Sequence, residues 1–187
     1  GSVIMVTKTV MTESNTSYAQ GGIAAVWSEE DTIDQHINDT CVAGDGLCDP
    51  AAVDCTVRDG PKRVQELIDA GVDFTRRFDD ASSYDLHQEG GHSFRRILHA
   101  EDLTGREIVR ALVNACKAHP NIEILEHHLA VDLITDQWMS RRAGHVPPRN
   151  DVVRGAYVLN VSRGDVGVIA SKVVVLATGG AGKVYLY

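Results

Sequence analysis

Long apolar segments are absent from this chain. Its 187 residues contain no run of about 18 apolar residues, so no membrane-spanning helix is predicted. The apolar run Val3–Val6 is too short for the hydrophobic region of a signal peptide. We therefore expect a cytoplasmic protein that has no membrane partner.

Positive charge is also scarce. The 18 lysines and arginines are outnumbered by 26 aspartates and glutamates, which gives a net charge of −8 at pH 7. This balance disfavours nucleic acid as a partner, because binding there depends on neutralising phosphates. The apolar share of 43% is ordinary for a soluble globular protein, and 187 residues are enough to bury one core.

Cysteine is sparse and lacks the spacing of a zinc site or a disulfide framework. Cys41, Cys48, Cys55 and Cys116 form no Cys-x-x-Cys pair. Reduced structural thiols in the cytosol are the favoured interpretation. A zinc site built from Cys41, Cys48 and His36 would not have the usual ligand spacing, so we predict no metal site.

The chain also lacks a Gly-x-Gly-x-x-Gly fingerprint after an apolar segment. The loop 178–182 with Lys183 is superficially similar to the phosphate-binding loop of ATPases. However, Ala177 stands where that loop needs its first glycine, and Val184 where it needs serine or threonine. An ATPase is therefore disfavoured, and by itself the loop is typical of a tight turn from a strand into a helix.

What the chain does contain is a series of apolar strands and amphipathic helices. Strands are predicted at 3–6, 122–125, 130–135 and 173–177. The first and last of these runs are continuously apolar, which predicts buried parallel strands. Residues 153–160 and 167–171 predict a β-hairpin, which follows an exposed excursion at 137–150. The fold class is therefore α/β.

Capping residues mark the first predicted helices. Asp31 is placed to cap a helix that ends at Gly44. Asp49-Pro50 begins a second helix, with proline in the first helical position. We expect Asp59-Gly60-Pro61 to interrupt this helix, because proline removes a backbone donor and clashes with the preceding turn.

A further helix is predicted to begin at Thr104. Glu107 stands three residues later, which is the spacing of a capping box. This helix is expected to end near His119-Pro120.

Two stretches carry the functional signal. Residues 15–25 read Asn-Thr-Ser-Tyr-Ala-Gln-Gly-Gly-Ile-Ala-Ala, which sets hydroxyls, an amide and two glycines in one loop after an apolar strand. Because Gly21 and Gly22 carry no Cβ, the backbone N–H groups of such a loop can approach a polyphosphate closely. Residues 89–100 set a carboxylate and a Gly-Gly hinge before two arginines and two histidines. Such a basic, hydrogen-bonding group suits a small dicarboxylate.

In this order, the two stretches resemble the flavoprotein family of L-aspartate oxidase, succinate dehydrogenase and fumarate reductase. The second stretch is most similar to the aspartate oxidases. The resemblance extends from Val3 to Tyr187. It implies an FAD-binding domain of the Rossmann-like, glutathione-reductase type, with a parallel sheet, helices and a β-hairpin excursion.

The resemblance also implies which residues meet FAD. Residues 15–22 correspond to the family's flavin-diphosphate loop, Lys8 to the end of the ribose-binding strand, and Leu129 to backbone at the adenine end. The loop at 178–182 corresponds to a segment that packs against the flavin nucleotide. The implied cofactor-binding residues are Lys8, Asn15, Thr16, Ser17, Tyr18, Ala19, Gln20, Gly21, Gly22 and Leu129.

Asn15 bears on how FAD is attached. Relatives with covalently bound flavin carry a histidine at this position, and an amide cannot form the histidyl–flavin bond. The resemblance therefore implies that FAD is held non-covalently.

Glu89 is the implied catalytic residue. Taken alone, it is a solvated surface carboxylate, as most glutamates are. In the aspartate oxidases, the glutamate at this position orients the substrate, and we expect it to face the α-ammonium group. Succinate has no ammonium group, and the succinate enzymes do not share this run.

The basic residues after Glu89 leave more than one interpretation open. His92 and His99 are candidates for contacts with substrate or flavin, although single histidines are more often structural. Arg95 and Arg96 can pair with a dicarboxylate or with Glu101 and Asp102, and we favour the structural pairing.

The resemblance places residues 3–187 inside a longer FAD-binding domain. The first βα unit with its glycine fingerprint is expected before Val3 and the C-terminal regions after Tyr187, while Gly1-Ser2 is typical of a tag remnant. By itself, this fragment is expected to be inactive. It is also expected to self-associate through the apolar strands at 3–6 and 173–177.

The whole enzyme is expected to oxidise L-aspartate to iminoaspartate, with O₂ or fumarate as the electron acceptor. The product leads to quinolinate and then to NAD, which makes quinolinate synthase a candidate partner. Two other hypotheses stay open. One is a flavoprotein subunit of the succinate dehydrogenase or fumarate reductase type, and the other is a non-catalytic nucleotide-binding module.

Overall fold

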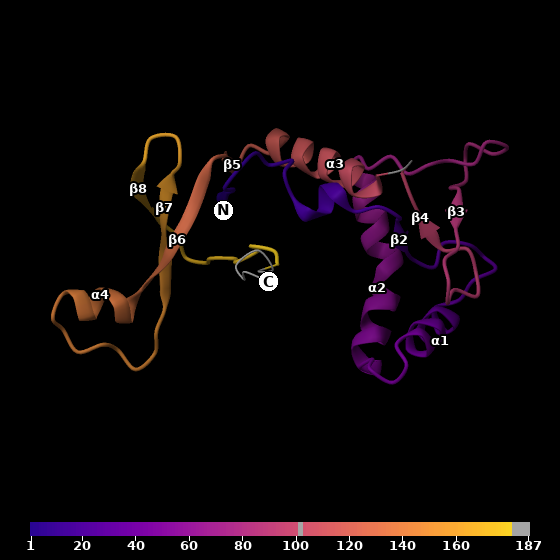
Figure 1. Cartoon of the computed structure of the whole chain (residues 1–187), viewed down its shortest axis with the longest axis horizontal. Helices are drawn as coiled ribbons and strands as arrows, with labels where there is room; N and C mark the ends of the chain where they lie inside the picture. Colours follow the sequence, from indigo (N-terminus) through magenta and orange to yellow (C-terminus); the bar gives the residue numbers. More distant parts are fainter. Residues whose placement is uncertain (101–102, 181–187) are drawn as a thin grey trace, which may run out of the picture. The chain divides into compact units, whose positions relative to one another are not determined.

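The computed structural model describes residues 1–100 and 103–180 (Figure 1). The chain divides into two compact units. Unit 1 comprises Gly1–Glu13 and Pro120–Tyr187, and unit 2 comprises Ser14–His119. Among the described residues, no helix combines the length and apolar character needed to cross a membrane.

Unit 2 begins with a short 3-10 helix and two α-helices. The 3-10 helix η1 spans Asn15–Tyr18, α1 spans Ile33–Ala43 and α2 spans Pro50–Asp69. The cap of α1 is Thr32, whose hydroxyl accepts a bond from the Gln35 N–H, and not Asp31 as predicted. The carboxylate of Asp31 is instead used in a buried ion pair with Arg96. Asp49 caps α2 as the sequence suggested.

The predicted interruption of α2 is wrong, because the helix runs through Pro61 without a break. Val57 and Val64 lie on either side of the proline, and both are buried. A break at Pro61 would remove one of these side chains from the core. Burying a valine side chain is worth roughly 1.5–3 kcal/mol, which is comparable to the cost of about 3 kcal/mol for an interior proline.

The core of unit 2 is apolar and small. Its buried members are Ala25, Val64, Val72, Phe74, Leu98 and Ala111. A three-stranded antiparallel sheet crosses this core in the order β2-β4-β3. Its strands are β2 (Ile23–Ala24), β3 (Leu86–His87) and β4 (Ile97–Leu98). The sheet therefore brings the two motif segments together, since β2 lies within the first motif and β4 within the second.

Helix α3 spans Thr104–Ala118 and ends where the sequence predicts. The predicted capping box is wrong, because the cap position is Leu103, which provides no side-chain bond. The Thr104 hydroxyl instead accepts a bond from the Ala100 N–H at 3.0 Å and donates to the carbonyl oxygen of Gly21. The Thr104 hydroxyl thus bonds to Ala100, four residues earlier, and to the distant Gly21, and it does not cap α3.

Unit 1 holds one parallel strand pair and one antiparallel sheet. Strand β1 (Val3–Val6) pairs in parallel with β5 (Ile122–Leu125), as expected for an α/β fold. Burial of β1 is not confirmed, because Val3 and Ile4 are about half exposed. Strands β6 (His128–Thr135), β7 (Val153–Asn160) and β8 (Asp165–Ala170) form a meander in sequence order. The predicted hairpin is the β7–β8 pair, and the excursion before it contains α4 (Asp136–Arg142).

The predicted strand at 173–177 is wrong. These residues form no strand, and Val173, Val175 and Leu176 are largely exposed. An apolar run becomes a strand only where neighbouring backbone groups bond to it, and none of the described residues pairs with this one. In the loop after it, Ala181 and Gly182 lie outside the described residues.

The continuity of α2 yields a stability prediction. Pro61→Ala should raise the free energy of unfolding by about 1–3 kcal/mol, because alanine restores an N–H donor to the helix interior. Urea denaturation followed by circular dichroism measures this change. The matched control is Pro50→Ala, which should change stability by less than about 0.5 kcal/mol because proline is tolerated in the first helical position. A loss of stability in Pro61→Ala would contradict the prediction.

Candidate functional site

The first motif forms a short, solvent-facing loop. Ser14 caps η1, since its hydroxyl accepts a bond from the Ser17 N–H at 3.3 Å. The Ala19 N–H closes the turn on the carbonyl of Thr16 at 3.0 Å. Within the loop, Ser17 is half-buried and the other residues from Asn15 to Gly22 are exposed. The loop is therefore ordered by its own backbone and remains open to a ligand.

The first turn of α3 supports this loop through hydrogen bonds. The Gly105 N–H donates to the carbonyl of Ala19 at 3.2 Å, and the Thr104 hydroxyl donates to the carbonyl of Gly21. A Cβ added at Gly105 would overlap the carbonyl of Thr16 and lie 2.9 Å from the Cβ of Ala19. Only glycine permits this close approach, so Gly105 is as much a part of the loop's support as Thr104.

Glycine is needed at both Gly21 and Gly22, for two different structural reasons. Gly21 has a φ of +76°, a backbone conformation that side chains disfavour. At Gly22 an added Cβ would overlap the carbonyl of Leu98 and lie 2.5 Å from Cγ2 of Ile97. The loop thus passes directly over β4, with the backbone of Gly22 against that of Leu98.

Glu89 lies next to this loop. A Cβ added at Gly21 would lie 3.5 Å from Oε1 of Glu89, which places the carboxylate in contact distance of the loop. The side chain is exposed, and none of the described residues pairs with its carboxylate. The structure therefore brings the first cofactor motif and the predicted substrate-binding carboxylate to the same place.

The turn that carries Glu89 is fixed by backbone and amide bonds. The His92 N–H donates to the carbonyl of Glu89 at 3.1 Å, and Gly91 has a φ of +88°. The Gln88 side-chain amide donates to the carbonyl of His92 at 2.5 Å. Just beyond the turn, Ser93 donates from its N–H and from its hydroxyl to the carboxylate of Asp39, both at 2.8 Å. Helix α1 thus anchors the C-terminal end of the turn.

Asp39 is one of two carboxylates around a fully buried arginine. Arg96 pairs with Asp39 at 2.9 Å and with Asp31 at 2.8 Å. Burial by itself would raise the pKa of Asp39. The two bonds from Ser93, the amide of Gln35 and the charge of Arg96 outweigh burial and hold the pKa at about 2. The expected partners of Arg96, Glu101 and Asp102, lie outside the described residues, and Asp31 and Asp39 take that role here.

The other basic residues of the second motif, Arg95 and His92, lie in different environments. Arg95 donates to the carbonyl of Leu86 at 3.2 Å and lines an open cavity of about 720 Å³ that Gln88 and Ser93 also line. His92 meets the ring of His36 edge-on, with centroids 6.2 Å apart. Burial, with the nearby charge of Arg96, lowers the pKa of His36. Arg95 is therefore exposed at this cavity, whereas Arg96 is buried between two carboxylates.

Lys8 and Leu129 belong to unit 1. The backbone on either side of Lys8 is bonded to the segment before Leu129, through His128 N–H to Thr7 carbonyl at 2.9 Å and His127 N–H to Thr9 carbonyl at 3.1 Å. Lys8 is exposed and Leu129 is 41% exposed. The structure thus brings these two predicted cofactor residues close together, as it does separately for residues 15–22 and Glu89.

Comparison with known proteins identifies the family of this chain. The family described as "FAD binding domain" matches residues 1–186. The chain belongs to this family. The expected α/β FAD-binding fold and the FAD cofactor follow from this membership and from the parallel pairing and helices described above.

Curated relatives and solved structures agree with the assignment. L-aspartate oxidase 1 of Ralstonia nicotianae is 46% identical, covering 99% of this chain and 33% of the relative. L-aspartate oxidase of Vibrio cholerae is 47% identical, covering 100% and 34%. The chain therefore spans about a third of these relatives' length. A quinol fumarate reductase structure from E. coli has a TM-score of 0.83 at 30% identity, covering 100% of this chain and 29% of that one. Mycobacterium smegmatis Sdh1 has a TM-score of 0.79 at 26% identity, covering 97% and 30%.

Sequence reasoning missed three residues that position the site. Asp39 lies 54 residues from the serine that it holds, and Thr104 lies 83 residues from Gly21. Gly105 lies inside the helix start predicted at Thr104, and nothing in that prediction indicates its contact with Thr16. The one usable signal was the Thr-Gly pair that follows the second motif, because a glycine in the first turn of a helix indicates a close backbone approach.

The depressed pKa of Asp39 yields a prediction on pH. Its folded pKa of about 2 lies below the ordinary value of 3.8, so the stabilisation is complete above about pH 4 and is lost as pH falls toward 2. The contribution is up to about 2 kcal/mol. Urea denaturation from pH 5 downward should show wild type and Asp39→Asn converging over this range.

The control for this prediction lies on the same helix. Asp34 is 88% exposed, and its pairing with Arg58 is screened by solvent. Asp34→Asn should follow the wild-type pH dependence. Arg96, Asp31 and His36 also face Asp39, and they are unchanged in both variants. A constant gap between wild type and Asp39→Asn from pH 5 to the acid limit would refute the assignment.

Proposed function

We propose that this chain is the FAD-contacting segment of an L-aspartate oxidase. The observation that carries the proposal is the placement of the Glu89 carboxylate against Gly21, which joins a cofactor loop to a substrate-type turn. Identity of 46–47% to L-aspartate oxidases over nearly the whole chain supports it. In this proposal, residues 3–187 are one part of the enzyme's FAD-binding domain.

In this proposal, different residues contact different parts of FAD and of the substrate. Residues 15–22 hold the flavin diphosphate with backbone N–H groups, and Lys8 and Leu129 meet the ribose and adenine end of FAD. When bound, FAD supplies the acceptor for a hydride from Cα of aspartate. Glu89 faces the α-ammonium group of the substrate and so fixes which hydrogen of the substrate points toward the cofactor. Arg95 is placed to attract a substrate carboxylate.

The remaining expectations follow from this activity. The reaction converts L-aspartate to iminoaspartate, and O₂ or fumarate takes up the electrons. The product is used in NAD biosynthesis, with quinolinate synthase as the partner that consumes it. The four free cysteines support a reducing, cytoplasmic location. The exposed Val3, Ile4, Val173 and Val175 support self-association of the segment when it is isolated.

A flavoprotein subunit of the succinate dehydrogenase or fumarate reductase type is the second candidate. The likeness to the E. coli quinol fumarate reductase structure favours it. Against it, Asn15 stands where a histidine would carry covalent flavin. The Glu89 turn adds a carboxylate beside the cofactor loop, where it would repel a substrate that has two carboxylates and no ammonium group.

The role of Glu89 can be tested in the full-length protein. Glu89→Gln keeps the shape and removes the charge, so a charge-assisted hydrogen bond worth roughly 1.5–3 kcal/mol should be lost. We expect kcat/KM for L-aspartate to fall about ten- to a hundredfold. Fumarate carries no ammonium group, so its binding should weaken little and can improve, because the repulsion between Glu89 and the fumarate carboxylates is lost.

The control separates recognition from architecture. Glu123 is an exposed glutamate of β5 in unit 1, and Glu123→Gln should leave both ligands unaffected. If Glu89→Gln weakened aspartate and fumarate equally, the residue would serve the fold of the turn and not recognition of the ammonium group.

Asn15 yields a prediction on flavin attachment. FAD should leave the full-length protein completely after acid or heat denaturation, because the amide of Asn15 cannot form the histidyl–flavin bond. Flavin fluorescence on a denaturing gel measures this directly. A fluorescent polypeptide band would show a covalent link and would argue for the second candidate.

A further inference from the structure

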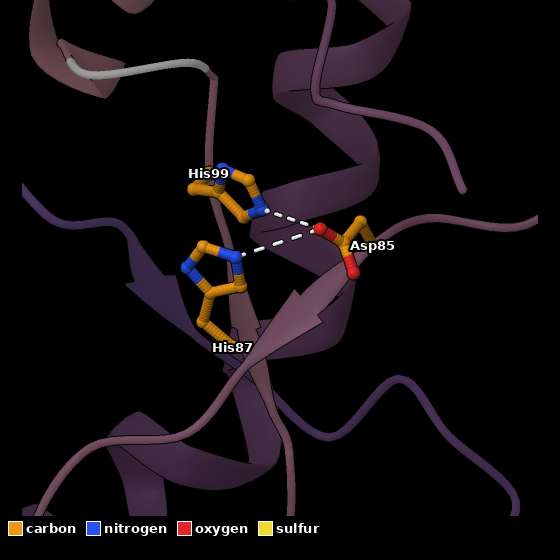
Figure 2. Close-up of side chains that lie close together, drawn as sticks. All are labelled: Asp85, His87 and His99. Carbon is orange, nitrogen blue, oxygen red and sulfur yellow. Dashed lines mark ion pairs between the residues drawn. The ribbon is translucent and has the colours of Figure 1, made fainter. Parts of the chain in front are cut away.

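Three chemically related side chains converge beside β3 and β4, outside the loop that holds FAD. Asp85 directly precedes β3 and His87 ends it, so the two residues are two positions apart, the spacing that sets side chains on the same side of an extended segment. Leu86 pairs with Leu98 and His87 with Ile97. Beyond this pairing, the Asp85 N–H donates to the carbonyl of Thr75 and the Thr75 N–H donates to the carbonyl of His99, so both residues lie beside Thr75. Antiparallel pairing therefore brings two imidazoles and one carboxylate to one face (Figure 2).

The distances are those of a ligand set. Nε2 of His87 lies 3.5 Å from Oδ2 of Asp85, and Nε2 of His99 lies 3.4 Å from the same oxygen. One potential ligand atom from each residue lies within 4.8 Å of the other two. Tetrahedral coordination at about 2.0–2.2 Å from a Zn²⁺ ion would set ligand atoms roughly 3.3–3.6 Å apart. Both contacts to the carboxylate already fall in this range.

Hydrogen bonding within the cluster does not account for it. Nε2 of His99 is buried, and none of the described residues makes a hydrogen bond with it. The rings of His87 and His99 are stacked with centroids 3.7 Å apart, so protonating both would bring two like charges together beside one carboxylate. A metal ion satisfies both nitrogens at once and needs both imidazoles neutral.

Access to the cluster comes from one side. The side chain of His99 is 9% exposed, while those of His87 and Asp85 are 54% and 45% exposed. An ion can thus reach the three atoms from solvent, and a water molecule can take the fourth position. We propose that Asp85, His87 and His99 bind a divalent transition-metal ion of the Zn²⁺ type through two imidazole nitrogens and one carboxylate oxygen.

The site borders the Glu89 turn on one side and the support of the 15–22 loop on the other. Glu89 follows His87 by two residues. Ala100 follows His99 directly, and its N–H is bonded to the Thr104 hydroxyl that holds Gly21. A bound ion would join β3 to β4 at this point and reduce the motion of both segments. The proposal stands on the cluster alone and does not depend on L-aspartate being the substrate.

Titration of the chelator-treated chain with Zn²⁺ in a calorimeter, and with Co²⁺ by visible absorption, tests the proposal. Wild type should bind one equivalent and show the absorption bands of a tetrahedral Co²⁺ ion. His87→Gln and Asp85→Asn change half-exposed side chains, so the fold should survive, and each should weaken binding at least tenfold. His145→Gln removes an exposed histidine of unit 1 and should have no effect.

Two results would overturn the proposal. One is the absence of Zn²⁺ and Co²⁺ binding to wild type, which would leave the cluster as an ion pair shared by two histidines. The other is equal binding by wild type, His87→Gln and Asp85→Asn, which would place the metal on other histidines or on the free cysteines. Circular dichroism of each variant shows that a loss of binding is not a loss of fold.

Discussion

The buried guanidinium of Arg96 organises unit 2. It is fully buried and pairs with Asp31 before α1 and Asp39 within α1, so β4 and this helix are joined by charge. Its backbone does the same for the sheet, since the Arg96 N–H donates to His87 and its carbonyl accepts from Ala25. Such a group adds little net stability, but removing one partner typically costs about 3–5 kcal/mol because a charge is left buried. Because an unpaired Arg96 would be so unfavourable, the second motif must pack against α1 in the one arrangement that keeps both ion pairs.

Glycine gives the site its second constraint. Gly22 lets the cofactor loop pass over the carbonyl of Leu98, and Gly105 lets it rest on the first turn of α3. Neither approach leaves room for a side chain. The loop is therefore held between a strand and a helix terminus through its own backbone, by close backbone approach and by the Gly105 N–H and the Thr104 hydroxyl, which bond to its carbonyls.

Much of the fold could be predicted, and the errors share a cause. The ends of α3, the β7–β8 hairpin and the pairing type of β1 follow from local signals: periodicity, turn residues and an apolar run. Pro61 and Thr104 carry equally strong local signals that tertiary contacts overrode, and the strand signal of 173–177 lacks a pairing partner among the described residues. Helix α2 keeps buried valines on both sides of Pro61, Thr104 bonds to Gly21 across 83 residues, and 173–177 has no described strand beside it. Local patterns fix propensity, and long-range partners decide the outcome.

The candidate site shows the same contrast between local sequence signals and long-range partners within a single segment. The role of Glu89 is a prediction from the recognisable motif that its sequence neighbours form. The supports of its turn could not be predicted, because Asp39 meets Ser93 only after folding. Along residues 85–99, strand alternation sends Asp85 and His87 to one face, the turn carries Glu89 to the cofactor loop, and Arg96 points to α1. The segment from β3 to β4 thus presents three kinds of group in different directions. These are the candidate metal ligands, the carboxylate of Glu89 and the buried cation of Arg96. The backbone geometry of the hairpin keeps these charged groups apart, which allows each to meet its own partner.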